Sequence, residues 1–179
     1  MQYFESERLI FRDWTLQDKI DFRKMNGDPQ VMEFFVKPLS EEESDALYER
    51  IVDEIRELGF GLYAVETKAG QNFIGFIGFS RVTYEADFTP CIEIGWRLNQ
   101  ASWGKGYATE GAKACMEYAA KNLDLDLIHS MTAQLNIKSQ NVMRKIGMTK
   151  DRDFLHPRIP SGNPLKEHVL YSYYLKSSK

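Results

Sequence analysis

The segment from residue 91 to residue 121 constrains the fold of this chain more than any other. A β-rich run, Cys91–Leu98, leads through a turn that contains Gly104 and Gly106 into a helical pattern that extends to about Lys121. Glycine permits positive φ, and the start of a helix presents free N–H groups and a partial positive charge. A strand that enters a helix through such a loop is therefore a candidate site for phosphate oxygens.

The spacing of this loop does not identify its ligand. A tight turn that binds nothing has the same pattern, although Lys105 and Lys113 would add charge beside a bound anion. The loop is not a Walker loop, because no Gly-Lys-Ser/Thr follows four residues after a first glycine. The third glycine and the acidic residue of a dinucleotide fingerprint are also missing.

Residue patterns predict a strand and three helices in the first third of the chain. Alternation over residues 7–12 predicts a first strand of about six residues. Thr15 three residues before Asp18, and Ser40 three residues before Glu43, are typical helix starts. The predicted helices are Thr15 to about Met25, the short segment Gln30–Phe35, and a longer helix that Ser40 caps and that ends at Gly59 and Gly61.

The remaining patterns predict a mixed sheet. Lys68–Gln71 is a turn between two β-rich runs, and Tyr84–Pro90 is a polar loop. The other predicted strands are Phe60–Thr67, Asn72–Thr83, Ile128–Gln134, Met148–Phe154 and His168–Leu175, and a further helix is Lys138–Ile146. This order predicts an α/β (α+β) fold, with helices on both faces of a mostly antiparallel sheet of about seven strands.

The composition is that of an ordinary globular protein. A length of 179 residues favours one domain over residues 1–179. The net charge of -3, without a basic run, argues against direct nucleic-acid binding. Cys91 and Cys115 are far apart and are read as buried thiols. No signal peptide or membrane span is predicted, so we expect a cytoplasmic protein.

Four segments carry a resemblance to a known family. They are Ser6–Trp14 (SERLIFRDW), Asp28–Met32 (DPQVM), Trp103–Glu110 (WGKGYATE) and Asn136–Met148 (NIKSQNVMRKIGM). Together they resemble the GCN5-related N-acetyltransferases (GNAT), and most closely the branch that contains the ribosomal-protein N-terminal alanine and serine acetyltransferases. One departure is Ala101, at a position where the wider superfamily often has Gln or Arg. The resemblance extends over nearly the whole chain and implies a single acetyltransferase domain.

The resemblance implies where acetyl-CoA would bind. The strand that ends at Leu98 would splay from the next strand, and acyl-CoA would lie in the gap. Backbone groups of Trp96 and Leu98 would pair with the pantetheine amides, as an added strand does. The other implied cosubstrate residues are Trp103, Gly104, Lys105, Gly106, Tyr107, Ala108, Thr109, Asn136, Ser139 and Lys145. A simple helix N-cap is the alternative role of Asn136.

The implied reaction is direct attack of a primary amine on the thioester. An alkylammonium must first lose a proton, and Glu93 is the first candidate for the base. The alternative for Glu93 is a strand residue that faces solvent or pairs with a basic neighbour. Ser139 is the candidate that hydrogen-bonds the sulfur or relays a proton to it, or else a surface serine of the first helical turn. A backbone N–H near Trp96 would polarise the carbonyl.

His156 and His168 are further candidates for a base or a substrate contact, because histidine titrates near neutral pH. The alternative is a structural hydrogen bond that braces the proline-rich loop, which we favour for His168. The scattered histidines do not predict a metal site.

The acceptor site is expected between Met25–Phe35 and the loop after Phe154. Candidate wall residues are Phe34, Phe35, Tyr63 and Trp96. The acceptor is either a protein N-terminus or a small amine, in a monomer or a homodimer. Two other classes stay open, namely a non-catalytic acyl-CoA-binding module and an interaction protein whose glycine turn binds nothing.

Overall fold

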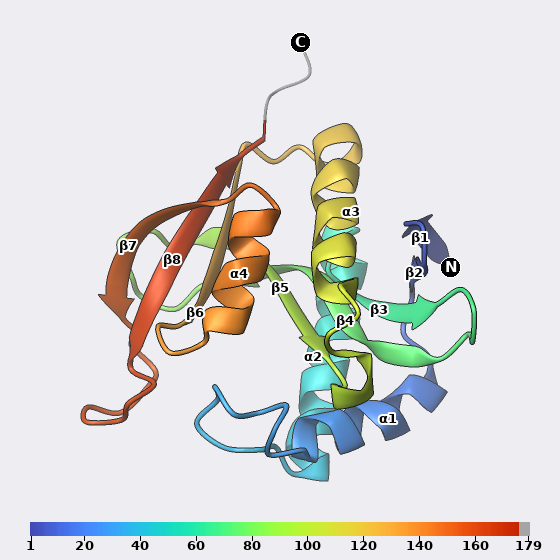
Figure 1. Cartoon of the computed structure of the whole chain (residues 1–179), viewed down its shortest axis with the longest axis horizontal. Coiled ribbons are helices and arrows are strands. Elements are labelled where there is room, and N and C mark those ends of the chain that lie inside the picture. The colour runs from blue at the N-terminus through green and yellow to red at the C-terminus, as the bar shows by residue number, and fades with distance from the viewer. Residues whose placement is uncertain (176–179) are drawn as a thin grey trace.

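The computed structural model describes residues 1–175, in which eight strands form one mixed sheet (Figure 1). The strand order is β1-β2-β3-β4-β5-β6-β8-β7, and every neighbouring pair is antiparallel except β5 and β6. The strands are β1 (Gln2–Glu5), β2 (Leu9–Arg12), β3 (Leu62–Thr67), β4 (Phe73–Val82), β5 (Cys91–Leu98), β6 (Leu127–Ala133), β7 (Thr149–Leu155) and β8 (Glu167–Tyr174). The helices are α1 (Leu16–Gly27), α2 (Glu41–Leu58), α3 (Tyr107–Asn122) and α4 (Ile137–Lys145). The predicted fold class is confirmed, with one strand more than expected.

The extra strand lies at the start of the chain. The strand predicted over residues 7–12 is present as β2 but has four residues instead of six, and it pairs as a hairpin with β1, which was not predicted. Arg8 does not extend the strand, because its N–H donates to Glu110 Oε1 at 2.8 Å. β1 gives a weak sequence signal because polar Gln2 and Glu5 flank its two aromatic residues.

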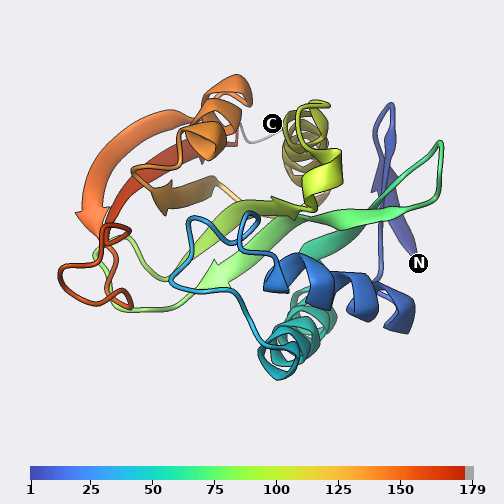
Figure 2. The ribbon, with the colours of Figure 1, turned by 60° about the horizontal axis from the view of Figure 1, so that its bottom comes forward.

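α1 and α2 cover one face of the sheet (Figure 2). Both predicted N-caps are confirmed as capping boxes, Thr15 with Asp18 and Ser40 with Glu43. Trp14 is central to this face, and its indole N–H donates to the carbonyl of Leu62 at 2.7 Å. The buried residues of this core are Trp14, Phe22, Met25, Val31, Tyr48, Ile51, Ile55, Ala64 and Phe76.

α3 and α4 cover the opposite face (Figure 2). Small side chains on α3, such as Ala112 and Ala119, are fully buried and let the helix lie close to the sheet. Ile94 and Leu98 of β5 belong to this core, whereas Phe76, which pairs with Arg97, belongs to the core on the α1–α2 side. Side chains on one face of β5 therefore point toward α3 and α4, and those on the other face point toward α1 and α2.

The segment Gln30–Phe35 forms successive turns, so the prediction of a short helix there was wrong. Asp28 begins the turns, because its side chain accepts from Gln30 N at 2.8 Å and its carbonyl accepts from Met32 N at 3.0 Å. Such local side-chain bonds compete with helix formation, and a segment this short gains too few backbone bonds to offset nucleation.

β5 and β6 diverge after a single paired position, Glu93 and His129. Side chains replace the missing backbone pairing: Ser130 Oγ donates to the carbonyl of Ile94 at 2.9 Å, and Met131 N donates to Glu93 Oε1 at 3.3 Å. The splayed strand pair that the resemblance implied is present. Within residues 1–175, no helix is long and apolar enough to cross a membrane.

Candidate active site

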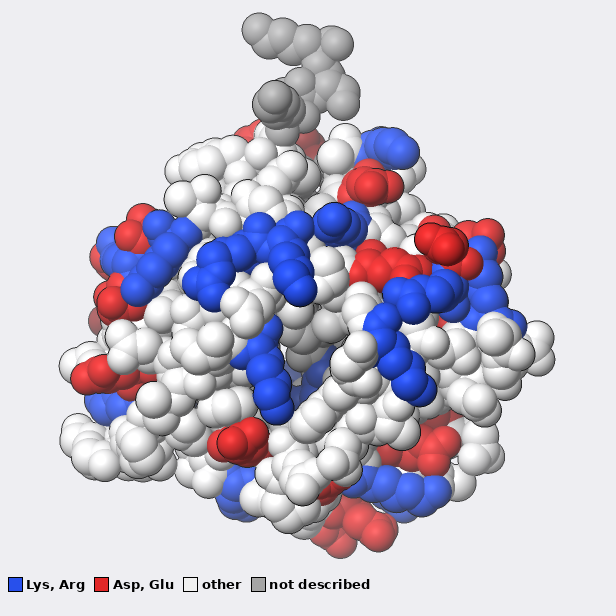
Figure 3. Space-filling model, in the orientation of Figure 1, with Lys and Arg blue, Asp and Glu red and all other residues white. Residues whose placement is uncertain are grey.

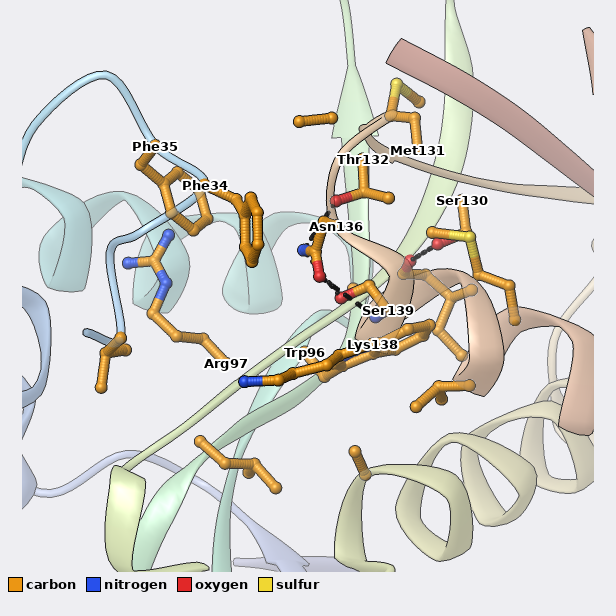
Figure 4. Close-up of a pocket in the computed structure, with 18 of the residues that line it drawn as sticks. Phe34, Phe35, Trp96, Arg97, Ser130, Met131, Thr132, Asn136, Lys138 and Ser139 are labelled. Atoms are coloured by element: carbon orange, nitrogen blue, oxygen red, sulfur yellow. Dashed lines mark hydrogen bonds between the residues drawn. The ribbon is translucent and has the colours of Figure 1, made fainter. Parts of the chain in front are cut away.

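A cavity of about 970 Å³ opens where β5 and β6 separate. Its volume lies within the usual range of small-molecule sites. It is bounded by β5 and β6, by the starts of α3 and α4, and by the segments 30–36 and 156–159. Figure 4 shows labelled side chains of the 30–36 segment, β5, β6 and the start of α4 converging on one space, and Figure 3 shows lysines and arginines around a hollow in this face of the molecule.

The glycine loop forms one end of the cavity. Gly104 and Gly106 have φ of 72° and 80°, so both adopt the left-handed conformation that favours glycine. Gly106 is the N-cap of α3, and no side chain of the described residues caps this helix. The N–H groups of the first turn at Tyr107, Ala108 and Thr109 are therefore free for an anion. Lys105 does not line the cavity, and its carbonyl accepts from Arg8 at 3.0 Å.

The start of α4 forms the facing wall. Asn136 Oδ1 accepts from Ser139 N at 3.2 Å, so Asn136 is the helix N-cap. Its Nδ2 donates to Ser139 Oγ at 3.1 Å and to Thr132 Oγ1 at 2.9 Å (Figure 4). The cap thus fixes the amide of Asn136 and the hydroxyl of Ser139, and both residues line the cavity together with Lys145.

Trp96 and Leu98 line the cavity from β5, as expected. Because β6 has diverged, this part of β5 has an edge without a neighbouring strand. The carbonyl of Leu98 accepts from Trp103 Nε1 at 2.9 Å, and Lys138 Nζ lies 5.1 Å from the centre of the Trp103 ring. Trp103 therefore contacts both the end of β5 and the start of α4.

Glu93 lies on the wall of the cavity where β5 and β6 begin to separate. Desolvation raises the pKa of its carboxyl group to about 7, and the N–H of Met131 offsets this only in part. Among residues 1–175, it forms no ion pair with a basic side chain, so the alternative of pairing with a basic neighbour is wrong. A carboxyl group with this pKa is available both as an acid and as a base near neutral pH.

His156 and His168 also line the cavity, with ring centroids 4.8 Å apart. Desolvation lowers the pKa of both, to about 4 for His156, so both rings are neutral at pH 7. The loop between them is braced by Lys166, whose Nζ donates to the carbonyls of His156 and Ile159. Nδ1 of His168 is buried without a hydrogen-bond partner among the described residues.

Three of the four residues predicted to wall an acceptor site line this cavity. Phe34, Phe35 and Trp96 line the cavity, as do Arg158 and Ile159 in the loop after Phe154. Tyr63 does not. It is fully buried and packs against Tyr3 and Phe4 in the core on the α3 side, so its assignment to this wall was wrong.

Sequence reasoning missed several residues of the site. They are Arg97, Ser130, Met131, Lys138 and Arg158. The strand period of two offered a signal for Arg97, because Glu93, Gly95 and Arg97 share one face of β5. Ser130 and Met131 gave no signal, since their bonds to β5 exist only where the two strands diverge. Within the described residues, no group of three or more His, Cys, Asp or Glu side chains is placed to hold a metal ion.

Comparison with known proteins places this fold and site in context. A family model described as an acetyltransferase (GNAT) domain matches residues 8–149. An uncharacterized N-acetyltransferase of Bacillus subtilis, YnaD, is 29% identical over 171 residues, which cover 95% of each chain.

Solved structures agree with this match. A GNAT-family acetyltransferase from Bacillus anthracis has a TM-score of 0.78 at 26% identity, over 97% of this chain and 98% of that one. The ribosomal L7/L12 alpha-N-protein acetyltransferase RimL, solved in complex with coenzyme A, has a TM-score of 0.80 over 99% of both chains. At 15% identity, RimL shows a shared fold only.

Proposed function

Since the chain belongs to the GNAT family of acetyltransferases, we propose that it transfers an acetyl group from acetyl-CoA to a primary amine. The acceptor is either a protein N-terminus, as in the ribosomal-protein N-terminal acetyltransferase branch that the sequence resembles, or a small amine.

One observation carries this proposal. Glu93, a carboxyl group with a pKa near 7, shares a single cavity with the uncapped glycine loop of α3 and with the hydroxyl of Ser139. A base, an anion-binding helix start and a group close to a leaving sulfur are the parts that acyl transfer from a phosphate-bearing thioester needs. RimL, which shares this fold, was solved in complex with coenzyme A.

The residues fit acetyl-CoA as a substrate. Free N–H groups of the first turn of α3 suit the pyrophosphate, with Gly104 and Gly106 allowing close approach. Lys138 and Lys145 add positive charge at the facing wall. The unpaired edge of β5 at Trp96 and Leu98 suits the two amides of the pantetheine arm, which would bind as an added strand does.

In the proposed reaction, Glu93 takes a proton from the ammonium form of the acceptor, directly or through water. The neutral nitrogen forms a bond to the thioester carbonyl carbon, while the N–H near Trp96 stabilises charge on the carbonyl oxygen. The carbon–sulfur bond then breaks as the nitrogen loses a second proton. The leaving thiolate takes up one proton, and the proton held by Glu93 passes to solvent. The products are an N-acetyl amide and coenzyme A.

Ser139 supports departure of the sulfur. Its hydroxyl accepts from Asn136 Nδ2, which directs the hydroxyl proton away from Asn136 and toward the cavity. A hydroxyl is a weak acid, so we assign it hydrogen bonding to the sulfur, or relay of a proton from water, rather than direct protonation from its own pKa.

A transfer screen tests the proposal. The protein is mixed with acetyl-CoA and a panel of N-terminal peptides, ribosomal proteins and small amines, and free thiol and acetylated product are both measured. We expect stoichiometric release of coenzyme A and formation of N-acetyl product with at least one class of amine. Tight binding of acetyl-CoA without turnover on any amine would instead identify a non-catalytic acyl-CoA-binding module.

A further inference from the structure

We propose that the acceptor carries a carboxylate, several bonds from its reacting amine, and that Arg97 binds this carboxylate. This inference rests on the proposed function and assigns a substrate class to the acceptor side of the same cavity. It is carried by the position, partners and charge of Arg97.

Arg97 lies on the α1–α2 face of β5. It pairs with Phe76, which belongs to the core on the α1–α2 side, and its Nη1 donates to Asn26 Oδ1 of α1 at 2.6 Å. The glycine loop, in contrast, leads into α3 on the opposite face of the sheet. Figure 4 shows the guanidinium directed toward Phe35 of the 30–36 segment. Arg97 therefore lies apart from the proposed phosphate site.

The guanidinium has neutral partners only. Asn26 is fully buried and is itself held by a 2.8 Å hydrogen bond to Ser44 Oγ. Phe35 and Phe76 present their rings to the cation, with its central carbon 4.3 Å and 5.4 Å from their centroids. These contacts orient the guanidinium and stabilise it through cation–π attraction, but they do not neutralise it.

The charge of Arg97 lacks the carboxylate partner that several other arginines of the described chain have. Arg8 pairs with Glu110, Arg12 with Asp18 and Glu66, and Arg23 with Asp45. Among residues 1–175, no carboxylate lies within 4.0 Å of the Arg97 guanidinium, and its Nε is buried without a hydrogen-bond partner. Arg97 is partly buried, and removing an unpaired charge from water is costly even in part, so a function that supplies a negative partner would explain it.

The environment leaves Arg97 cationic under ordinary conditions. Desolvation lowers the pKa of the guanidinium to about 10, still well above neutral pH. A carboxylate that enters the cavity would supply the missing negative charge, and the planar guanidinium suits that geometry.

The spacing of Glu93 and Arg97 along β5 sets the distance between the amine and the carboxylate of the proposed acceptor. Glu93 and Arg97 lie on one face four residues apart, so their Cα atoms are about 13 Å apart. An amine that approaches Glu93 and a carboxylate that reaches Arg97 must therefore be separated by several bonds. A peptide with an acidic second or third residue meets this requirement, as does a long ω-amino acid.

Matched acceptor pairs test this inference. One pair is a short peptide with Asp at its second or third position and the same peptide with Asn, and the other is an ω-amino acid and its amide. We expect the wild-type kcat/KM to favour the acidic member by at least about tenfold, the strength of one hydrogen bond to a charged group. In Arg97→Gln this ratio should fall close to one, mainly through KM, and Arg97→Lys should retain part of it.

Arg81→Gln is the matched control, because Arg81 pairs with Glu57 on the surface and does not line the cavity. Its selectivity ratio should equal that of the wild type. Turnover without acidic preference in the wild type would overturn the inference, as would loss of the ratio in Arg158→Gln instead of Arg97→Gln. Weakened acetyl-CoA affinity in Arg97→Gln with unchanged acceptor preference would also overturn it. Absence of turnover with every amine would contradict the proposed function instead.

Discussion

At the scale of single residues, Glu93 shows how a side chain acquires its chemistry from its position. A glutamate on an exposed strand would ionise well below neutral pH. Here the carboxyl group lies where β5 leaves β6, where desolvation opposes ionisation and a single N–H, from Met131, favours it. The balance places the pKa near 7, whereas the neighbouring histidines have pKa values lowered away from neutrality.

The first prediction concerns the pH dependence of turnover. The base must be ionised, so kcat/KM should rise with pH through an ionisation near 7. Glu93→Gln should lower kcat by about 10²- to 10⁴-fold and remove this ionisation, while acetyl-CoA affinity stays close to normal. A full pH–rate profile with purified protein measures both. Retention of the ionisation in Glu93→Gln, or its loss in His156→Gln, would reassign the base.

The second prediction concerns stability. The folded-state pKa of Glu93 is raised above its unfolded value, so the folded protein binds more protons and loses stability as pH rises from about 4.5 to above 7. Glu93→Gln removes this loss. The variant should gain stability over the wild type at pH 8 by at most about 3 kcal/mol and gain little at pH 4.5. Urea denaturation at both pH values measures the difference, and equal effects at the two would contradict the pKa assignment.

At the scale of elements, the pair β4 and β5 holds the site in place. All eight residues of β5 pair with β4, whereas β6 pairs with β5 only at Glu93. The position of β5 therefore depends mainly on β4. Gly75 lies opposite Leu98 with a φ of 135°. A Cβ there would lie 2.1 Å from the carbonyl oxygen of Arg97 and 2.9 Å from Leu98 Cα. The close approach of the two strands therefore requires glycine.

The third prediction follows from that contact. Gly75→Ala should destabilise the protein by about 2–4 kcal/mol, because the clash is with backbone that cannot rotate away. Gly95→Ala is the matched control on β5, since a Cβ there meets nothing within 4 Å, and it should change stability by less than about 1 kcal/mol. Denaturant unfolding measures both. Similar losses in the two variants would argue against the steric explanation.

At the scale of the whole molecule, the proposed cosubstrate site lies where backbone pairing within the sheet is interrupted. Two helices pack on each face, and the eight strands are continuous except where β5 and β6 diverge. A ligand in this gap contacts both halves of the molecule, so its binding energy stabilises the whole fold by mass action.

The fourth prediction is a thermal shift. Coenzyme A at about 100 times its Kd should add about 2.7 kcal/mol, or roughly 5–10 °C in Tm for a chain of this size. Gly106→Ala should reduce this shift. Gly162→Ala is the matched control, because Gly162 has nearly the same φ, 82° against 80°, and does not line the cavity. Both variants should lose about 1–2 kcal/mol of stability from strain. An equal coenzyme A-induced Tm shift in the two variants would contradict the assignment of this loop to the binding site.

Local signals in the sequence were sufficient for most elements. Capping boxes at Thr15 and Ser40, the alternation of β5 and the glycines before α3 each act within a few residues, so they specify local structure without knowledge of the fold. The four segments that resemble the GNAT family indicated the fold class and the family. Local signals gave a wrong prediction at 30–35, where a turn that begins at Asp28 replaces the predicted helix.

Tertiary structure alone decided the chemistry of the site. The pKa of Glu93 depends on desolvation between two strands that are distant in sequence, and the exclusion of Tyr63 from the cavity depends on how the N-terminal hairpin packs. The uncompensated charge of Arg97 likewise depends on which side chains surround it in space. Burial and long-range contacts are properties of the folded chain, so the pattern of residue types along the sequence does not contain them directly.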